Sequence, residues 1–412
     1  MKKQGFILLL LLLFMQHSYA QISGCTDPMA SNYNTAATIN DGSCVYSNAS
    51  VTPVSSNILD SILSETSGLI IWNNYLWTHN DNSDTNLYSL DTATAVIVQT
   101  LPLSGVQNND WEDIAQDSNY IYIGDFGNNG NGNRTDLKIL RIAKTSVLMG
   151  SPIADTINFS YADQTDFTPA GANNTDYDCE ALIVTHDSIF LFTKQWVSQK
   201  TSVYALPKIP GTYSAQLKTG YDVSGLITGA TYLESKRLVV LCGYSSLLQP
   251  FIYLLYDFSG YNFFSGNKRK ISVSLPFYQT EGIATANGLK YYLSNEYFTQ
   301  PPFVTNEQKV HILDLSPYLG IYLNYSMLSI SENNSELSMR MYPNPANDFI
   351  IIEVSKNLLP SDYMITDSAG KIVMSGKLSE EKSKIRIKKM RSGLYYLSVN
   401  KNLKQSFAVI RQ

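Results

Sequence analysis

The chain has 412 residues, too many for one ordinary domain, and carries a mild formal net charge of −5. Tyrosine is abundant at 28 residues and charged residues make up only 16%, a composition that favours extracellular β-structure over a helical enzyme. The charge is uneven: residues 340–412 hold 13 Lys and Arg against 6 Asp and Glu, so the rest is acidic and a poor candidate for binding nucleic acid.

Residues 1–20 have the layout of a secretory signal peptide. Two lysines precede an apolar run, and Ser18 and Ala20 place small residues at the −3 and −1 positions of a cleavage site before Gln21. A membrane anchor is the alternative, but the run is too short to span a bilayer, and no other stretch could span one. We therefore expect a mature protein outside the cytoplasm, without a transmembrane segment, in which disulfides form.

Residues 21–48 are predicted to form a short disulfide module. Cys25 and Cys44 bracket a segment rich in Asp, Asn, Gly and Pro, which cannot bury a core and is expected to need a disulfide. Its Asp and Asn side chains either bind Ca²⁺ weakly or build turns. The segment resembles the "GCTDP…NYN…A…DGSC" unit of many secreted proteins from bacteria with type IX secretion.

A repeated pattern occupies residues 49–330. Five segments begin with a polar residue, continue through two apolar strands joined by a polar turn, and end 13 or 14 positions later. This spacing predicts five antiparallel hairpins. Their first and last positions are Ser67 and Asn80, Glu112 and Asp125, Glu180 and Lys194, Thr228 and Cys242, and Glu281 and Asn295.

Further strands complete each repeat. Third strands are expected at 86–91, 137–142, 202–206, 251–258 and 309–315, and fourth strands at 95–101, 156–162, 215–223 and 270–277. Four strands per repeat are typical of a β-propeller. Residues 57–62 can supply the missing strand of the fifth repeat and close the ring. We predict an all-β chain with a five-bladed propeller; six blades or a β-sandwich are the alternatives.

The first residues of the hairpins are expected to surround one mouth of the central channel. Glu112, Glu180 and Glu281 would then repel one another unless a cation, Lys194, Arg134 or bound protons offset their charge. Ca²⁺ is the expected cation for oxygen ligands in a secreted protein, with these three glutamates as its ligands. Alternatively, the carboxylates accept backbone N–H bonds and only lock the ring. The predicted ligand-binding set is Glu112, Asp113, Asp125, Glu180, Lys194, Glu281, Asn295 and His79.

The phrases "WTHND", "DWEDIA", "IGDFGNN", "DCEAL", "FTK" and "TEGIA" resemble secreted bacterial propellers described as esterase-like or phytase-like. The resemblance covers about residues 57–318. Its enzyme interpretation is Ca²⁺-dependent hydrolysis of a phosphate or lactone ester, with Asp125 or His79 assisting an activated water. "VLCGY" in the fourth repeat departs from that pattern because it has no charged residue at the ring position. The alternative is a binding protein in which Trp77, Trp111 and Trp196 stack on a sugar or peptide.

Two further cysteines, Cys179 and Cys242, fall near the same predicted mouth. They either pair between neighbouring blades or remain buried thiols. The sequence contains no G-x-S-x-G pattern, so a hydrolase of the nucleophile-elbow type is not supported.

A polar linker at 331–339 precedes a second domain at 340–412. Alternating strands with Asn-Pro and Ser-Ala-Gly turns predict a small β-sandwich there. "MYPNPANDF", Asp367, Gly370-Lys371 and "GLYY" resemble the type A sorting domain of type IX secretion. The resemblance implies handling by that secretion machinery, removal of the domain, and release or attachment to surface polysaccharide. The alternative is a folded accessory domain that is not cleaved.

Overall fold

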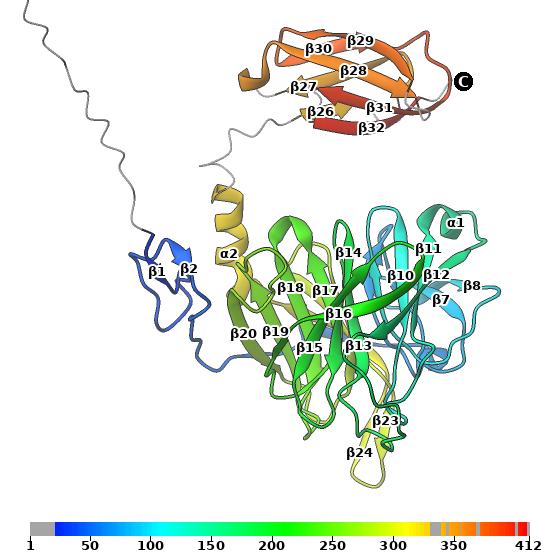
Figure 1. Ribbon diagram of the computed structural model, residues 1–412, viewed down its shortest axis with the longest axis vertical. Helices are drawn as coiled ribbons and strands as arrows, with labels where there is room; N and C mark the ends of the chain where they lie inside the picture. Colours follow the sequence, from blue (N-terminus) through cyan, green and yellow to red (C-terminus); the bar gives the residue numbers. More distant parts are fainter. Residues whose placement is uncertain are drawn as a thin grey trace, which may run out of the picture. The chain divides into compact units, whose positions relative to one another are not determined.

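The computed structural model describes residues 21–329, 339–342, 346–354, 356–367, 371–399 and 403–409. The predicted signal peptide and residues 331–338 of the predicted linker lie outside the described residues. The chain divides into two compact units, Met1–Leu323 and Asn324–Gln412 (Figure 1). Within the described part, no helix is both long and apolar enough to cross a membrane.

The first unit contains five successive groups of four strands in which neighbours pair antiparallel. Figure 1 labels strands of the first four groups. The strands are β5 (Ile70–Trp72), β6 (Tyr75–Thr78), β7 (Asn86–Asp91) and β8 (Ile97–Pro102); β9 (Trp111–Gln116), β10 (Tyr120–Asp125), β11 (Lys138–Ala143) and β12 (Ala154–Tyr161); β13 (Asp178–Val184), β14 (Ser188–Lys194), β15 (Thr201–Pro207) and β16 (Gly211–Tyr221); β17 (Leu226–Leu233), β18 (Leu238–Tyr244), β19 (Pro250–Tyr256) and β20 (Asn267–Val273); and β21 (Thr280–Thr285), β22 (Lys290–Asn295), β25 (Lys309–Asp314) and β4 (Ser55–Ile58). The predicted repeat of four strands is thereby confirmed, and the fold is all-β and propeller-like.

The fifth group combines strands from both ends of the unit. β4 pairs antiparallel with β25, so the N-terminal segment supplies the fourth strand as predicted. The strand covers 55–58 rather than the predicted 57–62. It stops early because Asp60 caps a short helical turn, η1 (Ser61–Leu63), by accepting a hydrogen bond from the backbone N–H of Ile62.

The first strands of the groups contact one another in a closed circuit: β5, β9, β13, β17, β21 and again β5. Between groups, apolar side chains from facing sheets interdigitate; Phe190 and Phe192 of β14, for example, pack with Val239 and Leu241 of β18. On the outside, β12 pairs in parallel with β16 and joins the second and third groups into one eight-stranded sheet. The circuit therefore places all five first strands around a common axis.

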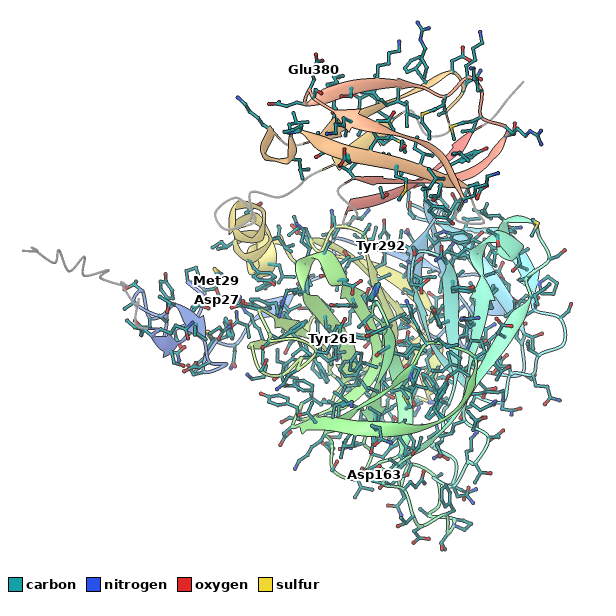
Figure 2. All side chains as sticks on the ribbon, turned by 45° about the horizontal axis from the view of Figure 1, so that its top comes forward. Asp27, Met29, Asp163, Tyr261, Tyr292 and Glu380 are labelled. Carbon is teal, nitrogen blue, oxygen red and sulfur yellow. A yellow bond between two sulfur atoms is a disulfide. The ribbon has the colours of Figure 1, made fainter. Side chains whose placement is uncertain are left out.

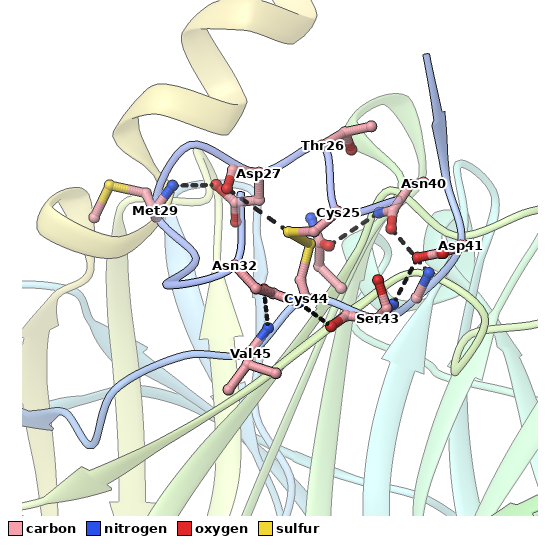
Figure 3. The surroundings of a disulfide bond; sticks show 12 residues. Cys25, Thr26, Asp27, Met29, Asn32, Asn40, Asp41, Ser43, Cys44 and Val45 are labelled. Carbon is pink, nitrogen blue, oxygen red and sulfur yellow. Dashed lines mark hydrogen bonds between the residues drawn. A yellow bond between two sulfur atoms is a disulfide. The ribbon is translucent and has the colours of Figure 1, made fainter. Parts of the chain in front are cut away.

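The N-terminal module packs against the fourth group. It contains β1 (Ser23–Gly24) and β2 (Ile39–Asn40), and the predicted Cys25–Cys44 disulfide is present (Figure 3). Asp27 lies in this module with Met29 (Figure 2), and its carboxylate accepts hydrogen bonds from the Met29 N–H and the Tyr256 hydroxyl at 2.8 and 2.5 Å. The turn-building interpretation of its acidic side chains is thereby supported.

The strand that follows the module covers an exposed sheet edge. β3 (Ser50–Val51) pairs in parallel with β20, the outermost strand of the fourth group. The Lys268 ammonium group donates to the Gly42 carbonyl at 2.9 Å, and Asn40 donates to Asp257 at 2.8 Å. Pairing and side-chain contacts together protect this edge from pairing with other chains.

The remaining elements are short, apart from one helix that begins in the first unit. α2 (Ser316–Ser329) starts after β25, and its Leu319 and Leu323 join the apolar cluster of the fourth and fifth groups. β23 (Phe298–Gln300) and β24 (Val304–Asn306) form a hairpin between β22 and β25. The helical turns α1 (Lys144–Leu148) and η2 (Glu234–Lys236) lie in other connections.

The second unit contains two sheets around one apolar cluster. β26 (Met339–Tyr342), β27 (Phe349–Val354) and β30 (Lys382–Arg386) form one, and β29 (Ile372–Leu378), β28 (Ser361–Asp367), β31 (Gly393–Val399) and β32 (Leu403–Val409) form the other, with η3 (Lys356–Leu358) between. Side chains alternate along β27, so Ile350 and Ile352 join Ile365 and Leu397 of the second sheet in the core.

Candidate functional site

The hairpin geometry brings the predicted mouth residues to one end of the first unit. In the third group, Asp178 at the start of β13 pairs with Lys194 at the end of β14, and in the fifth group Thr280 pairs with Asn295. The register shifts at Glu112, Glu180, Thr228 and Glu281, so four of the five first residues sit in a β-bulge. A bulge redirects a side chain out of the regular ladder, which is how these positions turn toward the axis.

Asp113 locks the ring from within. Its carboxylate is fully buried and accepts backbone N–H bonds from Ile114 at 2.8 Å, Leu182 at 2.9 Å and Ala230 at 3.3 Å. These donors belong to three different groups, so one side chain connects β9, β13 and β17. Burial raises the pKa of Asp113 well above its usual value, although the three N–H bonds oppose that effect. The structure thus separates Asp113 from the acids of the mouth.

The acids that do gather at this end outnumber their counter-charges. We call the following set the acidic mouth: Glu65, Asp81, Asp110, Glu112, Asp178, Glu180, Glu281 and Glu296. The pKa of Glu112, for instance, is raised first by burial and then by repulsion from Glu180, Asp110, Asp178 and Asp81. Lys194 is the cation among them, and its ammonium group lies 3.0 Å from the Glu180 carboxylate. Burial opposes its charge, but Glu180 and Glu281 raise the pKa of Lys194 well above its usual value.

One half of the acidic mouth is built on the second and third groups. A Cβ at Gly127 would lie 2.1 Å from a Glu112 oxygen and 2.4 Å from an Asp110 oxygen, so both carboxyl groups converge where glycine leaves space. Burial raises the pKa of Asp110 to about 6 and that of Glu112 well above its usual value. Asp178 accepts hydrogen bonds from the Trp196 indole N–H at 2.7 Å and the Asn128 backbone N–H at 2.6 Å.

The other half lies between the first and fifth groups. Carboxylate oxygens of Glu65, Asp81 and Glu296 all lie within 4.8 Å of one another. Burial, followed by repulsion from Glu296 and Glu65, raises the pKa of Asp81 to about 8. Burial raises the pKa of Glu296 to about 7. Among the described residues, this trio is the set with the spacing of metal ligands, whereas Glu112, Glu180 and Glu281 do not form one.

Three of the predicted site residues are engaged elsewhere. The Asp125 carboxylate is buried between Arg134 and Lys138, at 2.7 and 2.8 Å. Asn295 donates to the carbonyl groups of Glu296 and Glu307 at 2.7 and 2.9 Å, which stabilises the turn after β22.

His79, the third of them, is fully buried beside the ring of Trp111, whose centroid is 5.7 Å away. Burial lowers the pKa of His79 to about 4, so the imidazole is neutral at pH 7. Trp77 and Trp111 are buried as well and have no face free for stacking, whereas Trp196 is partly exposed.

Cys179 and Cys242 are both free, buried thiols, which decides between the two alternatives for this pair. The Cys242 thiol lies 3.9 Å from the Thr228 hydroxyl and 3.4 Å from the Glu281 carbonyl. Burial raises the pKa of both thiols well above the usual value, so neither is a reactive thiolate.

Sequence reasoning missed five acids of the mouth, although a signal for them exists. Glu65, Asp110 and Asp178 each lie two positions before the first residue of a hairpin, and Asp81 and Glu296 each lie one position after the last. Residues that flank the ends of a hairpin stay at the same end of the sheet as those ends. Extending the comparison of repeats by two residues in each direction identifies all five.

The comparisons with known proteins concern the two units separately. Residues 340–410 match the family described as the secretion system C-terminal sorting domain, which implies handling by the type IX secretion machinery and a secreted or cell-surface location. No curated protein matches the chain.

Among solved structures, PQQ-bound aldose sugar dehydrogenase from Streptomyces coelicolor is 11% identical, with a TM-score of 0.36, covering 63% of this chain and 98% of that one. PorZ, a surface component of the type IX secretion system of Porphyromonas gingivalis, is 15% identical, with a TM-score of 0.29, covering 84% and 45%. The WD40 repeats of RRP9 are 9% identical, with a TM-score of 0.35, covering 65% and 99%.

Proposed function

We propose that this chain is a type IX secretion cargo whose first unit is a five-bladed β-propeller that binds Ca²⁺ at its acidic mouth. Five blades are supported by the five groups of four strands, the circuit of first strands and the pairing of β4 with β25. After export through its sorting domain, the propeller acts outside the cell, where Ca²⁺ is abundant. This ion prefers carboxylate oxygens as ligands.

The observation that carries the proposal is the state of Glu281. The residue is only 6% exposed, and burial raises the pKa of its carboxyl group well above the usual value. Its strongest electrostatic neighbours after Lys194 are the acids Glu296, Glu180 and Asp81. A buried carboxylate surrounded by like charges needs either a proton or a cation.

The neighbouring trio supports a cation. Oxygens that share one Ca²⁺ lie about 2.4 Å from it, so two ligands on opposite sides are about 4.8 Å apart. The limit of 4.8 Å that Glu65, Asp81 and Glu296 satisfy is consistent with one shared ion. Glu281 interacts electrostatically with Glu296 and Asp81, although it is not one of the three residues with ligand spacing. On the opposite side of the mouth, the Lys194 ammonium group would neutralise the charge of the Glu180 carboxylate.

The hydrolase interpretation has weaker support. It assigns proton transfer to Asp125 or His79, yet Asp125 is held by two cations and His79 is buried against Trp111. A general base must reach the proton that it removes, directly or through one water. Ca²⁺ binding without catalysis is therefore the function that the geometry supports best.

Calcium titration by isothermal calorimetry into the metal-free mature chain, residues 21–412, tests the proposal. We expect one binding event that Glu296→Gln weakens at least about tenfold, because a charged ligand is lost. Glu307→Gln is the matched control, because Glu307 lies in the same loop with an exposed carboxylate 3.7 Å from Lys309. Absence of binding, or equal weakening by both variants, would contradict the proposal.

A further inference from the structure

Exposed apolar side chains border the acidic mouth in three loops of the fourth and fifth groups. Leu247 is 80% exposed between β18 and β19, Phe277 is 51% exposed between β20 and β21, and Phe303 is 83% exposed in the β23–β24 hairpin. The connection from a second to a third strand and the connection from a fourth strand to the next first strand both lie at the end of the group where its hairpin begins and ends. We call these three residues the apolar ledge; they lie at the end that carries Glu281 and Glu296.

Hydrogen bonds between the loops hold the apolar ledge in place. The Phe277 N–H donates to the Leu248 carbonyl at 2.8 Å, and the Asn306 side chain donates to the Phe277 carbonyl at 2.6 Å. Phe277 and Leu248 have φ angles of 70° and 53°, a left-handed conformation that such residues rarely adopt. Backbone that is costly to form thus holds Phe277, whose side chain is exposed, beside the exposed Leu247, a combination typical of an interaction surface.

The ledge is also connected to the acids. Tyr297 follows Glu296 directly, and its N–H donates to the carbonyl of Ser64, the residue before Glu65, at 2.7 Å. From Tyr297 the chain runs straight into the hairpin, which projects beyond the other loops at this end (Figure 1). The hairpin that carries Phe303 is therefore attached directly to the acidic mouth through Glu296 and Tyr297.

Charge complementarity indicates what covers this face. The eight carboxyl groups of the mouth outnumber its one lysine even when one calcium ion is bound, and a positive charge brought close to them favours their ionised form. Anionic partners are repelled. A partner must bring positive charge for the mouth and apolar groups for the ledge.

We propose that the acidic mouth and the apolar ledge together dock an extended polypeptide segment rich in lysine or arginine and in leucine or aromatic residues. An extended segment advances about 3.3 Å per residue, so a short peptide reaches from the acidic mouth onto the projecting hairpin. Its basic side chains would contact the mouth and its apolar side chains the ledge. Aromatic and aliphatic groups on the ledge exclude water around the contacts, which strengthens the charge pairs. This docking surface includes the mouth of the proposed function but does not require the calcium ion.

Fluorescence anisotropy with labelled synthetic peptides tests the proposal on the mature chain, residues 21–412. The probe is a decapeptide of alternating lysine and leucine; one control replaces lysine by glutamine, and another replaces leucine by serine. We expect both controls to bind at least about tenfold more weakly than the probe at 50 mM salt, and probe affinity to fall at 300 mM salt. Equal binding of all three peptides, or no binding of the probe, overturns the proposal.

Variants locate the contact. Leu247→Ala and Phe303→Ala should each weaken probe binding about fivefold or more, because each removes an exposed apolar contact. Leu148→Ala is the matched control: this leucine is 65% exposed in α1, which follows a third strand and lies at the other end of its group. If Leu148→Ala weakens binding as much as Leu247→Ala, the ledge is not the docking surface.

Measurements with 5 mM calcium and with chelator separate this inference from the calcium proposal. Probe binding that persists in chelator, together with absence of calorimetric calcium binding, contradicts the calcium site alone. Calcium binding without any probe binding contradicts the docking surface alone.

Discussion

Replacing Glu296 by glutamine should stabilise the metal-free propeller at alkaline pH and leave it unchanged in acid. Burial raises the pKa of Glu296 from 4.5 to about 7, so the folded chain binds this proton more tightly than the unfolded chain does. Stability from this group is therefore complete below pH 4.5 and is lost as the pH rises through 7. A pKa difference of that size lowers the unfolding free energy at pH 8 by about 3 kcal/mol relative to acid. Glu296→Gln removes this loss because glutamine does not ionise.

Urea denaturation in chelator at pH 5 and pH 8, followed by tryptophan fluorescence, measures this effect. The four tryptophans lie at positions 72, 77, 111 and 196, so the signal reports the first unit alone. Wild type should lose stability between the two pH values, and the variant should lose less, while Glu307→Gln should behave as wild type. A wild-type stability that rises from pH 5 to pH 8, or a variant with the wild-type profile, would refute the reasoning.

Three further outcomes are expected. Lys194→Met should destabilise the first unit by about 3–5 kcal/mol in urea denaturation because it leaves Glu180 buried without its partner, and adding Glu180→Gln should restore most of that loss; no restoration would refute the pairing. Replacing both Cys25 and Cys44 by serine should lower the stability of the N-terminal module by about 3 kcal/mol, measured as faster amide exchange at residues 21–48; unchanged exchange would show that docking on Tyr256 suffices. Deleting residues 340–412 should leave a folded propeller that fails to reach the cell surface in fractionation; surface delivery of the truncated chain would contradict the role of the sorting domain.

The strand pattern of the first unit was predictable because short apolar runs bounded by polar turns are visible directly in the sequence. The third strand at 86–91, for instance, was predicted without error, whereas the closing strand predicted at 57–62 covers 55–58 and so ends four residues early. The displacement came from Asp60, whose capping of η1 outweighs the β-propensity of the apolar residues around it. The local sequence pattern thus predicts where strands occur more accurately than where they end.

The composition of the candidate site was less predictable, because bulges and hydrogen bonds between groups determine it. Glu112 and Asp113 are adjacent, yet one faces the acidic mouth and the other locks the ring through Leu182 and Ala230. The sequence contains no signal for a bulge at Glu112, and the donors to Asp113 are about 70 and 117 positions away in the chain. The ion pairs of Asp125 with Arg134 and Lys138 were likewise not predictable from the local sequence pattern.

The central claim is that the acidic mouth exchanges protons for a calcium ion. Calorimetric titration of Ca²⁺ into the mature chain at pH 7, repeated in two buffers with different ionisation enthalpies, counts the protons that binding releases. Because the pKa of Asp81 is about 8 and that of Glu296 about 7, the account predicts release of about one proton or more per ion bound. Calcium binding with no proton release, or no heat of binding in either buffer, would contradict it.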